Sequence, residues 1–139
     1  MPQDEFERAA AAKASISFKK AKNKAQTYAN DSEKLNDLID QASRKAFSKA
    51  SALEAIWTQL SACFRLIRAY AKGTYREVPW NSIIAIIAAI IYFVMPFDLI
   101  PDFIAGFGLL DDAALLGWTV KAFRTEIETF LKWEAEVTS

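Results

Sequence analysis

The fold of this chain is constrained most by a stretch of twenty residues without a charged side chain, from Val78 to Phe97. Pro79 suits the first turn of a helix, and Pro96 ends it because proline has no backbone N–H to donate. Counted from Pro79 to the residue before Pro96, the helix has about seventeen residues and spans about 25 Å. This length is at the lower limit for crossing a bilayer and also suits a buried core helix. The sequence therefore predicts one very hydrophobic helix over residues 80–95.

So apolar a helix has to be covered, because removing apolar surface from water gains about 25 cal/mol per Å². The candidate covers are lipid, an apolar stripe over residues 53–71 and a second apolar face over residues 116–130. Trp80 and Tyr92 lie near the two ends of the helix, where membrane proteins place interfacial aromatic residues. These features favour a membrane-embedded, transmembrane segment, with a wholly buried helix as the alternative.

Charge is distributed unevenly along the chain. Residues up to Glu77 carry fourteen basic and nine acidic side chains, a net charge of +5, and the remainder carries three and eight, a net charge of −5. An excess of Lys and Arg before an apolar helix keeps that side in the cytoplasm. We therefore expect the cytoplasmic face of a bacterial inner membrane, with the cytoplasm as the alternative. The basic half carries no nucleic-acid-binding signature, so we expect no nucleic-acid partner.

The composition indicates an all-α fold and excludes several kinds of site. The chain is 53% hydrophobic and has only four glycines and four prolines, too few turn residues for a many-stranded β fold. With no histidine, it can form neither a Ser-His-Asp triad nor a zinc finger of the Cys₂His₂ type. The single cysteine, Cys63, has apolar neighbours and is predicted to be a buried thiol.

Three further helices are predicted from helical spacing. Asn30, Asp31 or Ser32 can cap a helix that ends near Ala50. Another begins at Ser51, with Glu54 three residues later as in a capping box, and stops at Gly73. The last begins at Asp111 or Asp112 and has a regular apolar face made by Leu116, Val120, Phe123, Ile127 and Phe130.

The segment between the apolar helix and the last helix is predicted to turn the chain back. Asp98 can accept backbone N–H groups in the turn "DLIPD", where Pro101 fixes φ, and Asp111 can cap the next helix. The apolar helix and the last helix are therefore expected to be antiparallel. The expected architecture is a small helical bundle with one very hydrophobic helix, a DLIPD turn and an antiparallel C-terminal helix.

The stretch "YFVMPFDLIPD" followed by "GLLDD" resembles the YkvA family, a bacterial helical domain of uncharacterised function. The resemblance covers roughly residues 80–120. Where this family usually has a second proline, the chain has Ala105 and Gly106. Related eukaryotic proteins carry the motif in membrane-embedded hairpins, and the resemblance implies no catalytic activity. The matching motif positions are Tyr92, Pro96, Asp98, Pro101, Asp102, Gly108, Asp111 and Asp112.

The four aspartates of the motif allow a second interpretation. Carboxylate oxygens are ligands for Mg²⁺, Mn²⁺ or Ca²⁺, and Asp98 and Asp102 could face Asp111 and Asp112 across the bend. Helix capping and bonds to turn amides explain the same spacing without an ion. We therefore expect no metal and no cofactor, and keep these four residues as alternative ligands.

A basic ridge precedes the apolar helix and is the second candidate site. Its members follow one another at intervals of three and four residues, the spacing of one helix face. Such a ridge is either a solvated face or a contact for phosphate or a partner. Any buried aspartate of the motif would take its cations from here. The basic ridge consists of Arg65, Arg68, Lys72 and Arg76.

Three functions are compatible with these features. We favour a nonenzymatic, membrane-associated helical module that binds a protein partner, with residues 1–50 as a basic N-terminal helical extension and residues 51–139 as the YkvA-like domain. The first alternative is a soluble helical binding or immunity-type protein that occludes its partner. The second alternative is a carboxylate-metal enzyme acting on phosphate or lipid. The sequence does not identify the partner or the oligomeric state.

Overall fold

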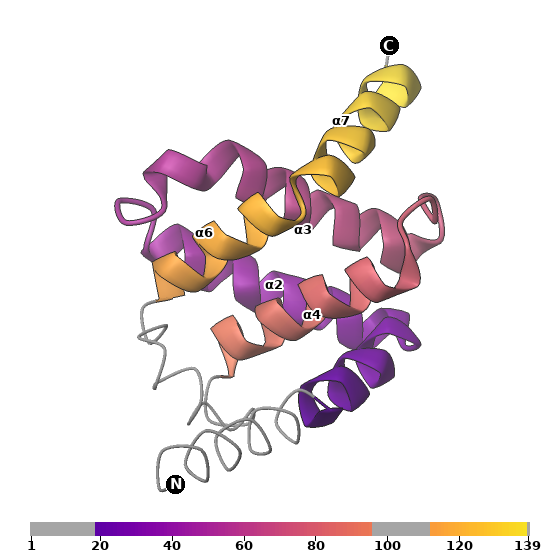
Figure 1. The fold of residues 1–139 in the computed structure, drawn as a ribbon, viewed down its shortest axis with the longest axis horizontal. Helices are drawn as coiled ribbons and strands as arrows, with labels where there is room; N and C mark the ends of the chain where they lie inside the picture. The colour runs from indigo at the N-terminus through magenta and orange to yellow at the C-terminus, as the bar shows by residue number, and fades with distance from the viewer. Residues whose placement is uncertain (1–18, 96–111, 139) are drawn as a thin grey trace, which may run out of the picture.

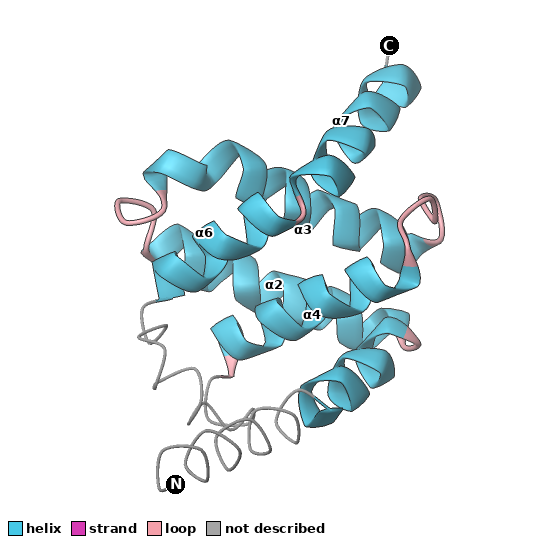
Figure 2. Cartoon of the chain, viewed as in Figure 1, coloured by secondary structure: helices cyan, strands magenta, loops and turns pink. Residues whose placement is uncertain are grey.

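A computed structural model describes residues 19–95 and 112–138, and every regular element in these two ranges is helical (Figures 1 and 2). This confirms the predicted all-α fold. Residues 19–29 form a first helix, and a short 3₁₀ helix, η1, precedes α3. The remaining elements are α2 (Ser32–Ser48), η1 (Glu54–Ile56), α3 (Trp57–Lys72), α4 (Trp80–Val94), α6 (Asp112–Ala122) and α7 (Arg124–Thr138).

Helix α2 begins as the sequence predicts. The side chain of Asp31 accepts a hydrogen bond of 3.1 Å from the backbone N–H of Lys34, which satisfies one of the free amides of the first turn. One face of the helix is buried against the rest of the molecule and consists of Leu35, Leu38, Ile39, Ala42 and Ala46. The buried residues of α2 and of the helices after residue 50 belong to one hydrophobic core. The division of the chain at residue 50 stays a prediction.

Helix α3 starts later than predicted. Ser51 lies in a turn, because the backbone N–H of Leu53 bonds to the carbonyls of Lys49 and Ala50, and Leu53 is itself buried. A 3₁₀ turn then leads into α3 at Trp57, where no side chain caps the helix. The predicted cap at Ser51 is therefore wrong.

The end of α3 at Gly73 is confirmed. Gly73 adopts a φ of 79°, the left-handed conformation that glycine adopts at little cost. Its N–H bonds to the carbonyl of Tyr70, and the N–H of Thr74 bonds to the carbonyl of Ala69. These bonds satisfy two carbonyls that the helix end would otherwise leave free.

Helix α4, the very hydrophobic helix of the sequence, lies inside the bundle. Nine of its fifteen residues are buried, and Ile83, Ile86 and Ile87 have no exposed surface. It packs chiefly against α2 and α6. The C-terminal apolar face, one of the three candidate covers, does lie against α4, whereas α2 takes the place of the second candidate, the stripe over residues 53–71. That stripe on α3 packs instead against α2, α6 and α7.

Helix α4 is two residues shorter than the estimate from the prolines. Fifteen residues span about 22 Å. In the two described ranges, we find no helix that combines enough length with enough apolar character to cross a membrane. The expected transmembrane helix is therefore not found there.

The C-terminal segment runs back along α4, as predicted, but as two helices instead of one. Figure 1 shows α6 antiparallel to α4, and α7 continuing at an angle until its C-terminal end projects from the bundle. The break is at Phe123. One turn earlier, the buried Thr119 donates its hydroxyl to the carbonyl of Leu115 at 2.8 Å, a bond that bends helices. The predicted apolar face is buried at Leu116, Val120, Ile127 and Phe130.

Candidate functional site

The motif residues fall largely outside the described residues. Tyr92 is buried in α4, and Asp112 opens α6. No group of acidic or cysteine side chains suited to a metal ion occurs in the ranges 19–95 and 112–138, but this says nothing of the turn between them. The metal and capping interpretations of this turn therefore remain predictions. The motif residues outside the described ranges are Pro96, Asp98, Pro101, Asp102, Gly108 and Asp111.

One positively charged side chain, that of Lys45, lies at the C-terminal end of α4. Lys45, on α2, donates from its Nζ to the carbonyl oxygen of Phe93 at 2.5 Å, and the same ammonium lies 4.9 Å from the centre of the Phe93 ring. Phe93 is in the last turn of α4, where a cation interacts favourably with the helix dipole. Sequence reasoning missed Lys45. Its position three residues after the buried Ala42 is the only signal that it points toward α4.

The basic ridge is engaged in contacts between helices. Arg65 donates two hydrogen bonds to Glu134 on α7, of 2.8 and 3.1 Å. Arg68 pairs with Asp40 on α2 at 2.6 Å. These pairs join α3 to the two helices beside it, so the two arginines have carboxylate partners other than the motif aspartates.

The other two members of the ridge lie at the end of α3. Arg76 stacks on the ring of Tyr70, with its guanidinium carbon 4.1 Å from the ring centre, and Lys72 is exposed. A cation over an aromatic ring is held by the negative face of the ring. The ridge therefore divides into a paired half, Arg65 and Arg68, and a half at the helix end.

Two arginines act on the same carboxylate at the edge of α2. The hydrogen bond from Arg68 lowers the pKa of Asp40, the positive charge of Arg68 lowers it further, and Arg44 adds to the effect. Asp40 is thus held in its charged form.

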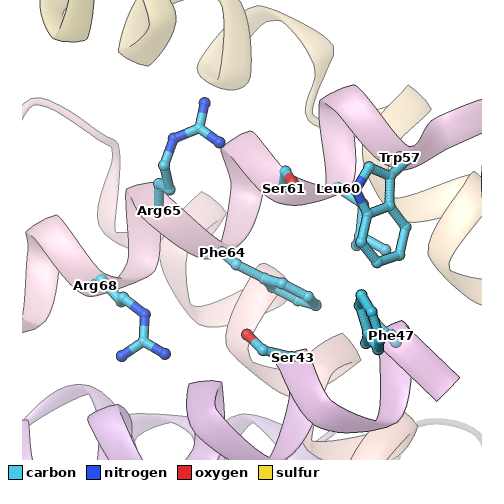
Figure 3. Close-up of a pocket in the computed structure, with 9 residues that line it drawn as sticks. Ser43, Phe47, Trp57, Leu60, Ser61, Phe64, Arg65 and Arg68 are labelled. Carbon is cyan, nitrogen blue, oxygen red and sulfur yellow. The ribbon is translucent and has the colours of Figure 1, made fainter. Parts of the chain in front are cut away.

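An open hollow of about 360 Å³ lies between α2 and α3, beside the paired half of the ridge. We call it the α2–α3 groove. Figure 3 shows the rings of Phe47 and Trp57 together at one end of the groove, the ring of Phe64 along its floor and Arg68 at the other end. The groove is lined by Ser43, Ala46, Phe47, Trp57, Leu60, Ser61, Phe64, Arg65 and Arg68.

Phe47 is the unusual residue of the groove. Its side chain is 74% exposed, although it is large and apolar. Sequence reasoning missed it because it follows directly on the buried Ala46 and could not be distinguished from the core face. Exposed aromatic side chains together with arginines are typical of binding surfaces.

Cys63 is buried, as predicted. Desolvation raises the pKa of its thiol from 9.0 to about 12, so the thiolate does not form near neutral pH. The residue is part of the core and has no features of a nucleophile.

Comparison with known proteins identifies the family. The model of a family described as "Protein of unknown function (DUF1232)" matches residues 82–118. Over 99 residues the chain is 31% identical to the uncharacterized membrane protein YkvA of Bacillus subtilis (strain 168), covering 71% of this chain and 93% of that protein. The chain belongs to this family. The YkvA match is long enough to include helices before α4, and no solved structure matches significantly.

Proposed function

We propose that this protein is a nonenzymatic helical module that associates with the cytoplasmic face of a membrane and binds a protein partner there. The observation that carries the proposal is the similarity to YkvA, which is described as a membrane protein and is matched over 93% of its length. The basic N-terminal half supports the cytoplasmic side, because cytoplasmic leaflets carry anionic lipids that attract Lys and Arg.

The burial of α4 determines how such a protein would meet a membrane. The apolar faces of α2 and α6 cover the nine buried side chains of this helix, which are therefore not available to lipid in this conformation. Membrane contact would then come from exposed groups at the surface. Phe47, Trp80 and Trp118 are large apolar side chains that are 74%, 42% and 56% exposed.

Trp118 supports the binding of a partner. It lies on the outer side of α6, within the segment that the family model matches. Tryptophan is enriched among the residues that dominate binding energy in protein interfaces, because it buries a large area with few rotatable bonds. An exposed tryptophan on a rigid helix is thus a suitable anchor for a partner.

Cell fractionation without detergent tests this proposal. We expect the protein to sediment with the membranes and to be released by an alkaline wash, because protein and not lipid covers α4. Protease added to spheroplasts should leave it intact until the inner membrane is opened, if it lies on the cytoplasmic side. Recovery of the protein in the soluble fraction, without a wash, would contradict membrane association.

The second candidate function is a soluble binding module that occludes its partner. The observation that favours it is the same burial of α4, which lets the bundle hold its most apolar helix without lipid. A monomer in the soluble fraction with α4 protected from hydrogen exchange would select this candidate. The enzyme alternative rests on the four aspartates, and metal analysis of the purified protein would test it.

A further inference from the structure

We infer that the α2–α3 groove is the membrane-contact site, and that it takes one anionic phospholipid with its acyl chain on the apolar floor and its phosphate near Arg68. This inference rests on the proposed membrane association and names the surface responsible for it. The groove runs from an exposed aromatic end, at Phe47 and Trp57, to a basic end, at Arg68 (Figure 3). That polarity matches a lipid, which is apolar along its chain and charged at its head.

The aromatic end has the side chains expected at a membrane surface. Phe47 is exposed and purely apolar, so it would gain by entering the hydrocarbon region. Trp57 is half-buried beside it, and tryptophan is enriched where proteins meet a membrane surface. Leu60 and Phe64 are buried under them and make an apolar floor for an acyl chain.

The charges around the groove favour an anionic headgroup. Arg44, exposed on α2, lies close enough to Asp40 to act on its charge, as Arg68 does, and Lys72 follows Arg68 along α3. Three carboxylates oppose them, namely Asp37 and Asp40 on α2 and Glu134 on α7, and the last two each pair with an arginine. Both pairs are partly exposed, with side chains 27% to 53% exposed, so water screens them and a phosphate can share the guanidinium groups.

A small-molecule ligand or a second copy of the chain fits these features less well. The hollow is open, and a free metabolite would leave the Phe47 ring in water. A second copy would have to bury Phe47 on a surface that also accommodates the cations around it. A lipid surface satisfies the apolar and the basic groups together.

Vesicle binding by the purified full chain tests the inference. The probes are vesicles of equal parts phosphatidylcholine and phosphatidylglycerol, and vesicles of phosphatidylcholine alone. We expect tighter binding to the anionic vesicles, and quenching of tryptophan fluorescence by brominated acyl chains. This quenching should fall in Trp57→Phe, because Trp57 is the tryptophan in the groove.

Matched variants locate the contact. Phe47→Glu should weaken binding by about tenfold, because it places a charge where an apolar ring enters the bilayer. Val137→Glu makes the same kind of change at an apolar residue of α7 that is 57% exposed, and should have no effect. Arg68→Gln should weaken binding by about fivefold, which corresponds to one lost cation at an anionic surface. Arg124→Gln removes a paired, exposed arginine away from the groove and should leave binding unchanged.

Each contrary result overturns the inference. Wild-type binding by Phe47→Glu, or loss of binding in Trp118→Glu instead, would place the membrane contact elsewhere. A dimer in sedimentation equilibrium that Phe47→Glu dissociates, with vesicle binding unchanged, would make the groove an interface between copies. Circular dichroism should show that Phe47→Glu is folded, since the side chain is exposed.

Fractionation separates this inference from the proposed function. If Phe47→Glu stays with the membranes as wild type does, membrane association stands and the groove is not its site. If the wild type itself remains soluble and binds neither kind of vesicle, both proposals fail.

Discussion

Asp31 shows how a single side chain sets a helix boundary in this molecule. Its carboxylate accepts the N–H of Lys34 at the start of α2. Replacing this cap in Asp31→Ala should cost about 1 kcal/mol of unfolding free energy, because the amide loses its partner. Chemical denaturation measures the change, and Asp37→Ala, on the exposed face of the same helix, is the control. Equal stabilities for the two variants would mean that Asp31 does not act as a cap.

The motif aspartates Asp98 and Asp111 are predicted to have the same kind of role. Asp98→Ala and Asp111→Ala should each cost about 0.5–2 kcal/mol, and stability and membrane binding should decline together. Thermal unfolding and vesicle binding, measured on the same samples, check this. A variant that keeps its melting temperature but loses an activity would favour a metal or catalytic role instead.

Cys63 makes the stability of the protein depend on pH in the alkaline range. Burial raises the pKa of its thiol in the folded state to about 12, against 9.0 for an ordinary thiol. Above pH 9 the unfolded chain loses this proton and the folded chain keeps it, so the contribution is complete below pH 9 and is lost as the pH rises toward 12.

The Cys63→Ala variant isolates this contribution. Its unfolding free energy should fall less steeply than that of the wild type between pH 9 and pH 12, because the remaining titrating groups are the same. Denaturant titrations at a series of pH values give both slopes. Identical slopes, or rapid reaction of the native thiol with a maleimide, would show that Cys63 is accessible.

At the scale of elements, replacing two different helix glycines by alanine should change the stability of the protein in opposite directions. Gly73→Ala forces a side chain into the left-handed region at the end of α3 and should destabilise the protein by about 1–2 kcal/mol. Gly117 lies inside α6 with open space around it, so Gly117→Ala should stabilise the protein by about 0.5–1 kcal/mol. Denaturation midpoints measure both. Destabilisation by Gly117→Ala would indicate a close neighbour that the described residues do not include.

The elements also show what the sequence could predict. The start of α2, the end of α3 and the apolar face of α6 and α7 follow from local chemistry, namely a cap, a glycine and a helical spacing. The late start of α3 and the break at Phe123 do not, because they depend on tertiary burial of Leu53 and on a buried hydroxyl at Thr119. No local sequence pattern indicates that either of these two side chains is buried.

For the candidate site, the sequence predicts the basic residues but neither their partners nor the exposed aromatic residue. The basic ridge was identified as a set of four cations at helical spacing. Its partners, Glu134 and Asp40, lie on other helices and 69 and 28 residues away, so no local pattern pairs them. Phe47 was missed for a similar reason, since only the packing of α2 on α3 shows which neighbouring apolar residue stays exposed.

At the scale of the whole molecule, the central feature is an apolar helix covered by protein. Helices α2 and α6 lie against α4, and Lys45 reaches its last turn. Because the bundle covers its most hydrophobic helix with protein, its exposed side chains can contact a membrane or a partner without exposing the core. Contact with a membrane through surface groups therefore requires that α4 be a core helix.

Hydrogen exchange of α4 in the purified, detergent-free protein tests this most directly. We predict that the amides of residues 83–93 exchange as slowly as those of the buried faces of α2 and α3, because all three helices open only when the bundle unfolds. Vesicles should leave this protection unchanged. Fast exchange of residues 83–93 without lipid, with protection gained only when vesicles or detergent are added, would contradict the account and make lipid the cover of α4.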